Sequence, residues 1–172
     1  MANASSSRGE FPVGDFGAKP GLKAPCTQAI QAAIDAAAAA GGGAVVFAPG
    51  AYFTGGLFLK SHVELRVDRG VDLIGVQDES AYPEIDSRVA GIEMRWPAAL
   101  VNVYRQAHAA ISGTGTIDGD GKVFWERYWA LRKAYQPRGL RWAADYDAGR
   151  PRLVQVYDSS AVKVGGGLKL RR

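Results

Sequence analysis

Leu100-Val-Asn-Val-Tyr104 recurs 53 residues later as Leu153-Val-Gln-Val-Tyr157. The same offset, without a gap, pairs three further positions: Ile111 with Val164, Gly113 with Gly166, and Ile117 with Leu170. A strand–turn–strand unit that recurs at a fixed period is the sequence sign of a solenoid. Because a single coil cannot bury its apolar face alone, several coils must stack for stability. The repeat therefore predicts an all-β solenoid.

The segment before this repeat also consists of short β-type runs. They cover residues 45–47, 52–54, 57–59, 63–67 and 72–74. Turn-forming pairs such as Pro49-Gly50 and Gly55-Gly56 separate them. Runs this short fit strands linked by tight turns, and they are too short for a large antiparallel sandwich.

One strong helix is predicted, over residues 27–40, with Thr27 as its N-cap. Its apolar face carries Ile30, Ala33, Ile34 and Ala37. Gly41-Gly-Gly43 ends it, because glycine tolerates the left-handed conformation at a helix C-terminus. We expect this helix to cover the open end of the first coil, which would otherwise invite edge pairing.

Residues 1–12 are expected to form a flexible lead-in, and residues 13–172 part of a single domain. Hydrophobic residues make up 47% of the chain and charged residues 22%, which is typical of globular proteins. No apolar run approaches the roughly 20 residues of a membrane span, so no membrane partner is expected. The first ten residues lack the apolar core of a secretory signal, so either export is absent or a leader has been removed. The sequence therefore does not assign the protein to a cellular compartment.

Soft metal ligands are scarce. Cys26 is the single cysteine, and His62 and His108 are the only histidines. A nucleophilic cysteine would need a histidine partner, and zinc would need more ligands than these. We therefore predict no disulfide within the chain, no metal site and no cofactor.

Charge is distributed unevenly. Residues 1–86 carry 6 Lys and Arg against 10 Asp and Glu, whereas residues 87–172 carry 15 against 7. Many of the arginines fall within residues 127–152. Such a cluster favours a polyanion, either nucleic acid or an acidic polysaccharide, although a charged loop is more often simply a solvated surface. We expect the polysaccharide and no nucleic acid.

Two insertions, residues 79–97 and 122–150, interrupt the coils and hold all four tryptophans. In repeat proteins, insertions gather on one face and often form the binding side. Exposed tryptophan and tyrosine could stack on sugar rings, or the aromatic residues could form a small satellite core. The candidate substrate contacts are Trp125, Trp129, Arg138, Arg141 and Trp142.

A family resemblance adds to this interpretation. Phe16-Gly-Ala18, the stretch from Cys26 to Asp35 and the stretch from Gly41 to Gly50 resemble the opening of pectin-lyase-like proteins. Residues 52–65, 70–75, 82–83, 115–121 and 150–157 are similar, in order and spacing, to polygalacturonases. The resemblance runs from about residue 11 to 172. It implies a right-handed parallel β-helix with an N-terminal capping α-helix, present here as its first few coils.

The resemblance implies hydrolysis of α-linked galacturonan or rhamnogalacturonan with inversion of configuration. An inverting site needs two carboxyl groups about 6.5–9.5 Å apart. In the family they come from an Asn-Thr-Asp motif and an Asp-Asp pair, supported by Gly-His-Gly and Arg-Ile-Lys. None of the four motifs occurs here, so no catalytic residue is assigned, and we expect an N-terminal segment that is inactive alone.

Asp118 and Asp120 offer another pair of carboxylates, but flanking glycines favour a structural turn.

The alternative function is a non-catalytic, polysaccharide-binding β-helix of the adhesin or tailspike kind. Members of the resembled family are often secreted or periplasmic.

Leu168-Lys-Leu170 is predicted to be a strand, and a coil that ended there would leave its apolar interior uncovered. We therefore expect self-association through that end.

Overall fold

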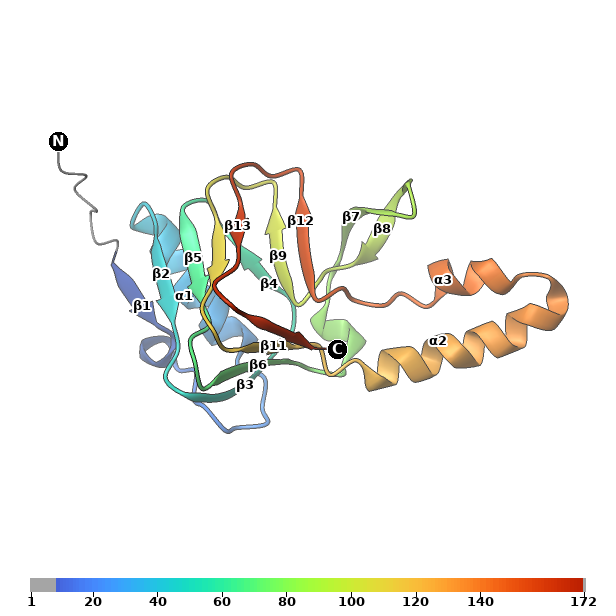
Figure 1. Cartoon of the computed structure of the whole chain (residues 1–172), viewed down its shortest axis with the longest axis horizontal. Coiled ribbons are helices and arrows are strands. Elements are labelled where there is room, and N and C mark those ends of the chain that lie inside the picture. Colours follow the sequence, from blue (N-terminus) through green and yellow to red (C-terminus); the bar gives the residue numbers. More distant parts are fainter. Residues whose placement is uncertain (1–8, 172) are drawn as a thin grey trace.

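A computed structural model describes residues 9–171, and three parallel sheets form its body (Figure 1). Strand β1 (Glu10–Pro12) pairs in parallel with β2 (Gly43–Val46) and is followed by a short 3-10 helix, η1 (Val13–Phe16). Residues 10–12 were expected within a flexible lead-in. They form a strand because the edge of β2 is free to pair and Phe11 packs against the core. Residues 1–8 of the expected lead-in lie outside the described residues.

Each coil contributes one strand to each of the three sheets. The first coil holds β2, β3 (Gly50–Thr54) and β4 (Leu57–Leu59). The second holds β5 (Val63–Arg66), β6 (Val71–Gly75) and β9 (Val101–Tyr104). The third holds β10 (Ala110–Ser112), β11 (Thr116–Asp118) and β12 (Val154–Tyr157), and β13 (Lys163–Val164) and β14 (Lys169–Arg171) begin a fourth.

The pairing order makes these coils a solenoid. The first sheet runs β1-β2-β5-β10-β13, the second β3-β6-β11-β14 and the third β4-β9-β12, and every pair within them is parallel. Val101 lies opposite Val154, Ile111 opposite Val164 and Ile117 opposite Leu170. The predicted solenoid and its offset of 53 residues are therefore confirmed.

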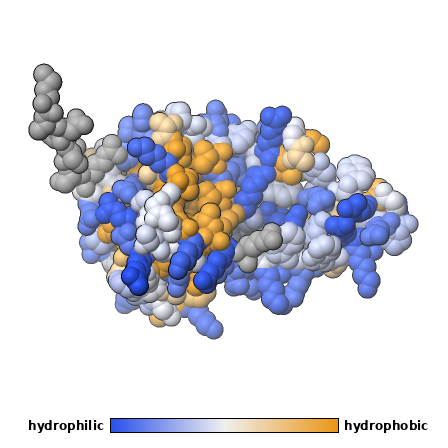
Figure 2. Space-filling view, viewed as in Figure 1, coloured by the Kyte–Doolittle hydropathy of each residue, from blue (hydrophilic) through white to orange (hydrophobic). Residues whose placement is uncertain are grey.

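The core is built from columns of apolar side chains that point into the coil. In the second sheet, one column consists of Tyr52, Leu73, Ile117 and Leu170. The first three are almost completely buried, whereas Leu170 is 53% exposed. Val156 and Val164 occupy the same outermost position in the other two sheets and are also exposed. Figure 2 shows an apolar area where β12, β13 and β14 lie. Self-association through this face stays a prediction.

The repeated glycines have a steric cause. Gly113 adopts a φ of +110°, and a Cβ there would lie 2.0 Å from the carbonyl oxygen of Val67. Gly166 stacks on it in the next coil, where a Cβ would lie 2.9 Å from the backbone of Gly113. Only glycine fits where successive turns approach backbone to backbone.

Helix α1 (Thr27–Ala39) buries the predicted apolar face against the first coil. The N-cap is Cys26, without a side-chain hydrogen bond, so the expectation for Thr27 was wrong. The Thr27 hydroxyl instead accepts a hydrogen bond from the Gly55 N–H at 2.8 Å. The Gln31 amide both donates to and accepts from the backbone of Phe58. The Thr27 hydroxyl therefore bonds to the first coil and not to the N-terminus of its own helix.

Both insertions leave the coil between a strand of the second sheet and a strand of the third. The first holds a 3-10 helix, η2 (Glu79–Ala81), and an antiparallel hairpin of β7 (Glu84–Val89) and β8 (Ile92–Pro97). The second, which we call the arm (residues 122–150), projects from the body (Figure 1). It holds α2 (Lys122–Tyr135), η3 (Gln136–Arg138), η4 (Arg141–Ala143) and α3 (Ala144–Asp147).

Helix α2 corrects the expectation of a single strong helix. Its sequence lacks glycine and proline for 14 residues, and Phe124 and Tyr128 bury one face. Lys122 and Glu126 form an i,i+4 ion pair in the first turn. No helix in the described part of the chain is long and apolar enough to cross a membrane.

The column in the second sheet gives a matched test of the core. Leu73→Ala should lower the free energy of unfolding by about 2–5 kcal/mol, because it leaves a cavity at a fully buried site. Leu170→Ala removes the same atoms from the exposed end of the column and should change it by about 0.5 kcal/mol or less. Urea unfolding followed by circular dichroism measures both. Equal losses would contradict the stacked-column description.

Candidate functional site

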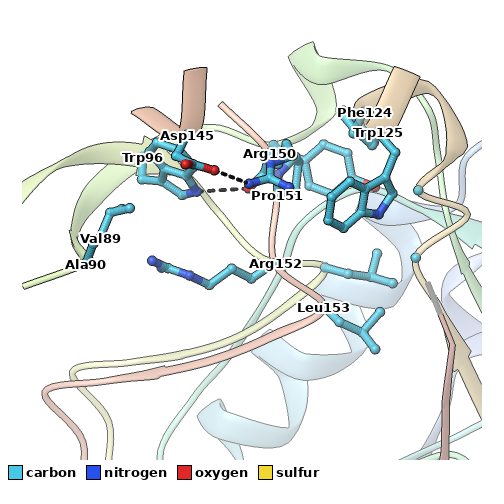
Figure 3. A pocket seen from close by; sticks show the side chains of 14 residues that line it. Val89, Ala90, Trp96, Phe124, Trp125, Asp145, Arg150, Pro151, Arg152 and Leu153 are labelled. Atoms are coloured by element: carbon cyan, nitrogen blue, oxygen red, sulfur yellow. Dashed lines mark hydrogen bonds and ion pairs between the residues drawn. The ribbon is translucent and has the colours of Figure 1, made fainter. Parts of the chain in front are cut away.

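A pocket of about 490 Å³ lies between the hairpin and the arm (Figure 3). Its walls include Tyr82, Trp96, Leu100, Phe124, Trp125 and Leu153. Three charged residues also line it: Asp145, Arg150 and Arg152. Its size and its apolar walls with a few polar groups are typical of small-molecule sites.

Arg150 links the arm to the hairpin. Its guanidinium carbon lies 4.1 Å from the ring centre of Tyr128 and 4.6 Å from that of Trp125. One of its terminal nitrogens lies 3.4 Å from a carboxylate oxygen of Asp145. The indole N–H of Trp96 donates to the Arg150 carbonyl oxygen at 2.9 Å. Cation–π contacts and an ion pair therefore hold this side chain in place, while its buried Nε makes no hydrogen bond.

Arg152 has a different environment. Its guanidinium donates to the Ser87 hydroxyl at 2.9 Å, to the Gln155 amide oxygen at 2.8 Å and to the Arg88 carbonyl oxygen at 2.7 Å. All three acceptors are uncharged, and none of the ion pairs between described residues involves Arg152. Burial lowers the pKa of Arg152, because desolvation penalises the charged form.

Tyr82 forms another wall of the pocket. Its hydroxyl donates to the Val76 carbonyl oxygen at 2.8 Å, and its ring meets Phe124 edge-on with centres 5.9 Å apart. Burial, with a smaller effect from the carboxylate of Asp120, raises the pKa of Tyr82 to about 12. The side chain is therefore neutral across the ordinary pH range.

The predicted substrate contacts do not meet at one point. Trp125 lines the pocket, whereas Trp129 and Trp142 are 55% and 65% exposed on the arm. Arg138 lies 5.8 Å from the ring centre of Tyr135, and Arg141 is an exposed residue of η4. Their contact with a sugar stays a prediction.

The aromatic residues of the arm were expected either to stack on sugar rings or to form a small satellite core, and the second expectation describes part of the arm. Tyr128, Ala144 and Ala148 form a small buried cluster, against which Trp125, Leu131 and Tyr135 pack. This is the satellite core that the sequence allowed. Trp129 and Trp142 are exposed and are not members of that cluster, although the Trp129 ring meets Tyr128 edge-on with centres 5.2 Å apart.

Sequence reasoning placed Arg150 and Arg152 in the arginine-rich stretch but did not select them as site residues. The available signal was their position directly before the repeated strand β12, which the coil brings beside the hairpin. Trp96 and Tyr82 were not predicted as wall residues either, because their proximity to the arm depends on how the coils stack.

Other candidate groups have structural roles. The Asp118 carboxylate accepts the Asp120 N–H at 2.9 Å, which confirms the predicted turn. The Cys26 thiol donates to the Phe53 carbonyl oxygen at 3.2 Å, and burial raises the pKa of Cys26. His62 and His108 stack at 5.1 Å on successive coils. Among the described residues, no cluster of three or more histidine, cysteine or acidic side chains could hold a metal ion.

Known proteins with similar sequence or structure give the family context. The chain matches no protein-family model. It is 31% identical, over 123 residues, to an exo-poly-alpha-D-galacturonosidase of Dickeya chrysanthemi. The match covers 67% of this chain and 20% of that protein, so the chain spans about a fifth of the curated relative.

Two solved structures extend the match to nearly the whole chain. A hyperthermoactive exopolygalacturonase from Thermotoga maritima is 26% identical with a TM-score of 0.79, covering 94% of this chain and 41% of that one. A family 28 exopolygalacturonase from Yersinia enterocolitica has a TM-score of 0.75 at 22% identity, covering 94% of this chain and 34% of that one. The second match supports the fold alone.

The shifted pKa of Tyr82 predicts how stability depends on pH. In the unfolded chain tyrosine loses its proton near pH 10, whereas in the fold Tyr82 keeps it to about pH 12. The folded state therefore binds more protons between these values, and stability should fall as pH rises through this window. The slope from this group is at most about 1.4 kcal/mol per pH unit. Tyr82→Phe should reduce the decline in urea-unfolding experiments, and an unchanged slope would contradict the assignment.

Proposed function

We propose that this chain, which is similar to the N-terminal portion of polygalacturonase-like glycoside hydrolases, forms the first coils of an enzyme that hydrolyses acidic pectic polysaccharide. The observation that carries this proposal is the similarity to a named exopolygalacturonase across nearly the whole described chain. The bond cut would be an α-linkage of galacturonan or rhamnogalacturonan, with inversion. The catalytic motifs of the family are absent from the sequence, so this segment would be inactive alone.

In this proposal, residues 13–172 belong to one right-handed β-helix domain, and α1 caps its first coil. The buried face of α1 and the Gln31 hydrogen bonds to β4 support the capping role. A helix at this position would cover the apolar interior at the end of the coil stack, next to the edge of β2 that β1 already pairs with.

We further propose that the arm contacts the polysaccharide. Its carboxylates are already engaged: Glu126 pairs with Lys122, Asp145 with Arg150, and Asp147 accepts from the Tyr135 hydroxyl. None of the ion pairs between described residues involves Arg132, Lys133, Arg138 or Arg141. Trp129 and Trp142 are exposed on the same segment, and the Arg132 guanidinium lies over the Trp129 ring at 5.1 Å from its centre. Together they suit a polyanion made of rings with apolar faces.

A non-catalytic polysaccharide-binding β-helix is the second candidate. The basic, aromatic arm favours it as much as it favours the hydrolase. The two candidates differ in whether the family's catalytic motifs accompany these coils.

The source DNA beyond the codon for Arg172, read in all three frames, tests the hydrolase proposal. We expect it to encode Asn-Thr-Asp, Asp-Asp, Gly-His-Gly and Arg-Ile-Lys in that order. The extended protein should then release reducing ends from polygalacturonate, and residues 1–172 alone should not. If no such motifs follow, the hydrolase proposal fails and the binding candidate leads.

The arm proposal is tested by two substitutions. Trp142→Ala and Arg141→Ala should each weaken polygalacturonate binding by about 2- to 10-fold, through the loss of one stacking face or one charge contact. The loss at Arg141 should shrink as salt rises, because exposed charges are screened. Isothermal titration calorimetry measures both effects. Arg69→Ala, which removes an exposed charge outside the arm, is the control, and an equal loss there would contradict a specific arm contact.

A further inference from the structure

The pocket between the hairpin and the arm holds a positive charge without a counterion. Of its three charged lining residues, Asp145 pairs with Arg150. Arg152 has only uncharged acceptors around it. A partly buried guanidinium that lacks a carboxylate has lost hydration without gaining an ion pair, which is a costly arrangement. An anion that enters the pocket would form an ion pair with this guanidinium and so offset the cost of its lost hydration.

Arg152 also retains hydrogen-bonding capacity. A guanidinium has five N–H donors, and the three bonds to Ser87, Gln155 and Arg88 use three of them. Two N–H groups are left for a ligand. Among anions, a carboxylate matches the planar fork of a guanidinium, with which it can form two parallel hydrogen bonds.

The remaining walls favour a ring. Trp96, Phe124 and Trp125 present aromatic surface. Tyr82 adds a further ring, and its hydroxyl stays uncharged because burial raises its pKa to about 12. Aromatic faces pack against the apolar face of a sugar ring while its edge stays polar. A volume of about 490 Å³ accommodates a small molecule of this kind.

We propose that this pocket binds the carboxylate-bearing ring of a uronate, and that Arg152 is the residue that selects the acid over the neutral sugar. Arg150 is a positioning residue, because it holds Trp125 and Tyr128 of α2 against the segment that carries Arg152. The choice of a uronate as ligand rests on the proposed function, whereas the anion preference rests on the pocket alone. This site is distinct from the exposed surface of the arm.

Titration of the folded chain with D-galacturonate and with D-galactose tests the proposal, since the two sugars differ in the carboxylate. The four tryptophan indole N–H signals in a nitrogen–proton correlation spectrum report where each sugar binds. We expect galacturonate to shift the signals of Trp96 and Trp125 and to leave those of Trp129 and Trp142 unchanged. Galactose should bind at least about tenfold more weakly, because it offers no partner for the charge of Arg152.

Arg152→Gln removes the charge and should abolish most of the preference for the acid. Arg69→Gln removes the same charge from an exposed position outside both the arm and the pocket and should leave the preference intact. Thermal unfolding of both variants shows whether they are folded. If Arg152→Gln does not fold, Arg152→Lys keeps the charge without the planar fork and should bind galacturonate more weakly than the wild-type chain does.

The outcomes separate this proposal from the arm proposal. Equal affinity of the wild-type chain for galacturonate and galactose would overturn the role of Arg152, as would an unchanged preference in folded Arg152→Gln. Shifts confined to Trp129 and Trp142 would overturn the pocket site and leave the arm proposal standing. Absence of any shift with galacturonate would overturn the pocket site as well, and polygalacturonate binding would then decide the arm proposal by itself.

Discussion

In-register parallel pairing of successive coils is the constraint on which the rest of this structure depends. Because each strand hydrogen-bonds to its equivalent one coil away, a side chain keeps its column from coil to coil. Tyr104 therefore stacks on Tyr157, with ring centres 5.1 Å apart. The same pairing leaves no room for extra residues within a strand. Insertions are confined to the corners between sheets, where the backbone is free to leave the coil.

The candidate site follows from that confinement. Both insertions leave at the same corner of two successive coils, so residues as far apart along the chain as Trp96 and Arg150, which are 54 positions apart, become neighbours. The hydrogen bond from Trp96 to the Arg150 carbonyl oxygen and the bonds from Arg152 to Ser87 and Arg88 then join them. The pocket belongs to neither insertion alone. Its geometry is set by the spacing of the coils from which both insertions leave.

The parts of the fold that depend on local or repeated patterns could be predicted from the sequence. The offset of 53 residues, the buried face of α1 and the paired Gly113 and Gly166 each follow from a periodicity or a steric rule. The errors arose where a distant partner competes with a local one. Thr27 bonds to Gly55 in place of capping its helix, and β1 forms because β2 has a free edge. No pattern in the sequence indicates which face of α2 meets the hairpin, so Trp125 could be proposed as a contact but its pocket could not.

Two buried amide side chains in one column of the third sheet, Asn102 and Gln155, connect the insertions to the coils. Asn102 is fully buried and bonds the backbone of Ala99 and Leu57, so its side chain ties the corner to the coil below. Gln155 stands in the same column one coil further on, but its amide bonds Ser87 and Arg152. Asn102 thus bonds to the backbone in one coil, and Gln155, at the same position in the next coil, orients the guanidinium of Arg152. Because Gln155 of β12 and two hairpin residues, Ser87 and Arg88, already hold Arg152, an entering anion would not have to order it, and less binding free energy would be lost to side-chain entropy.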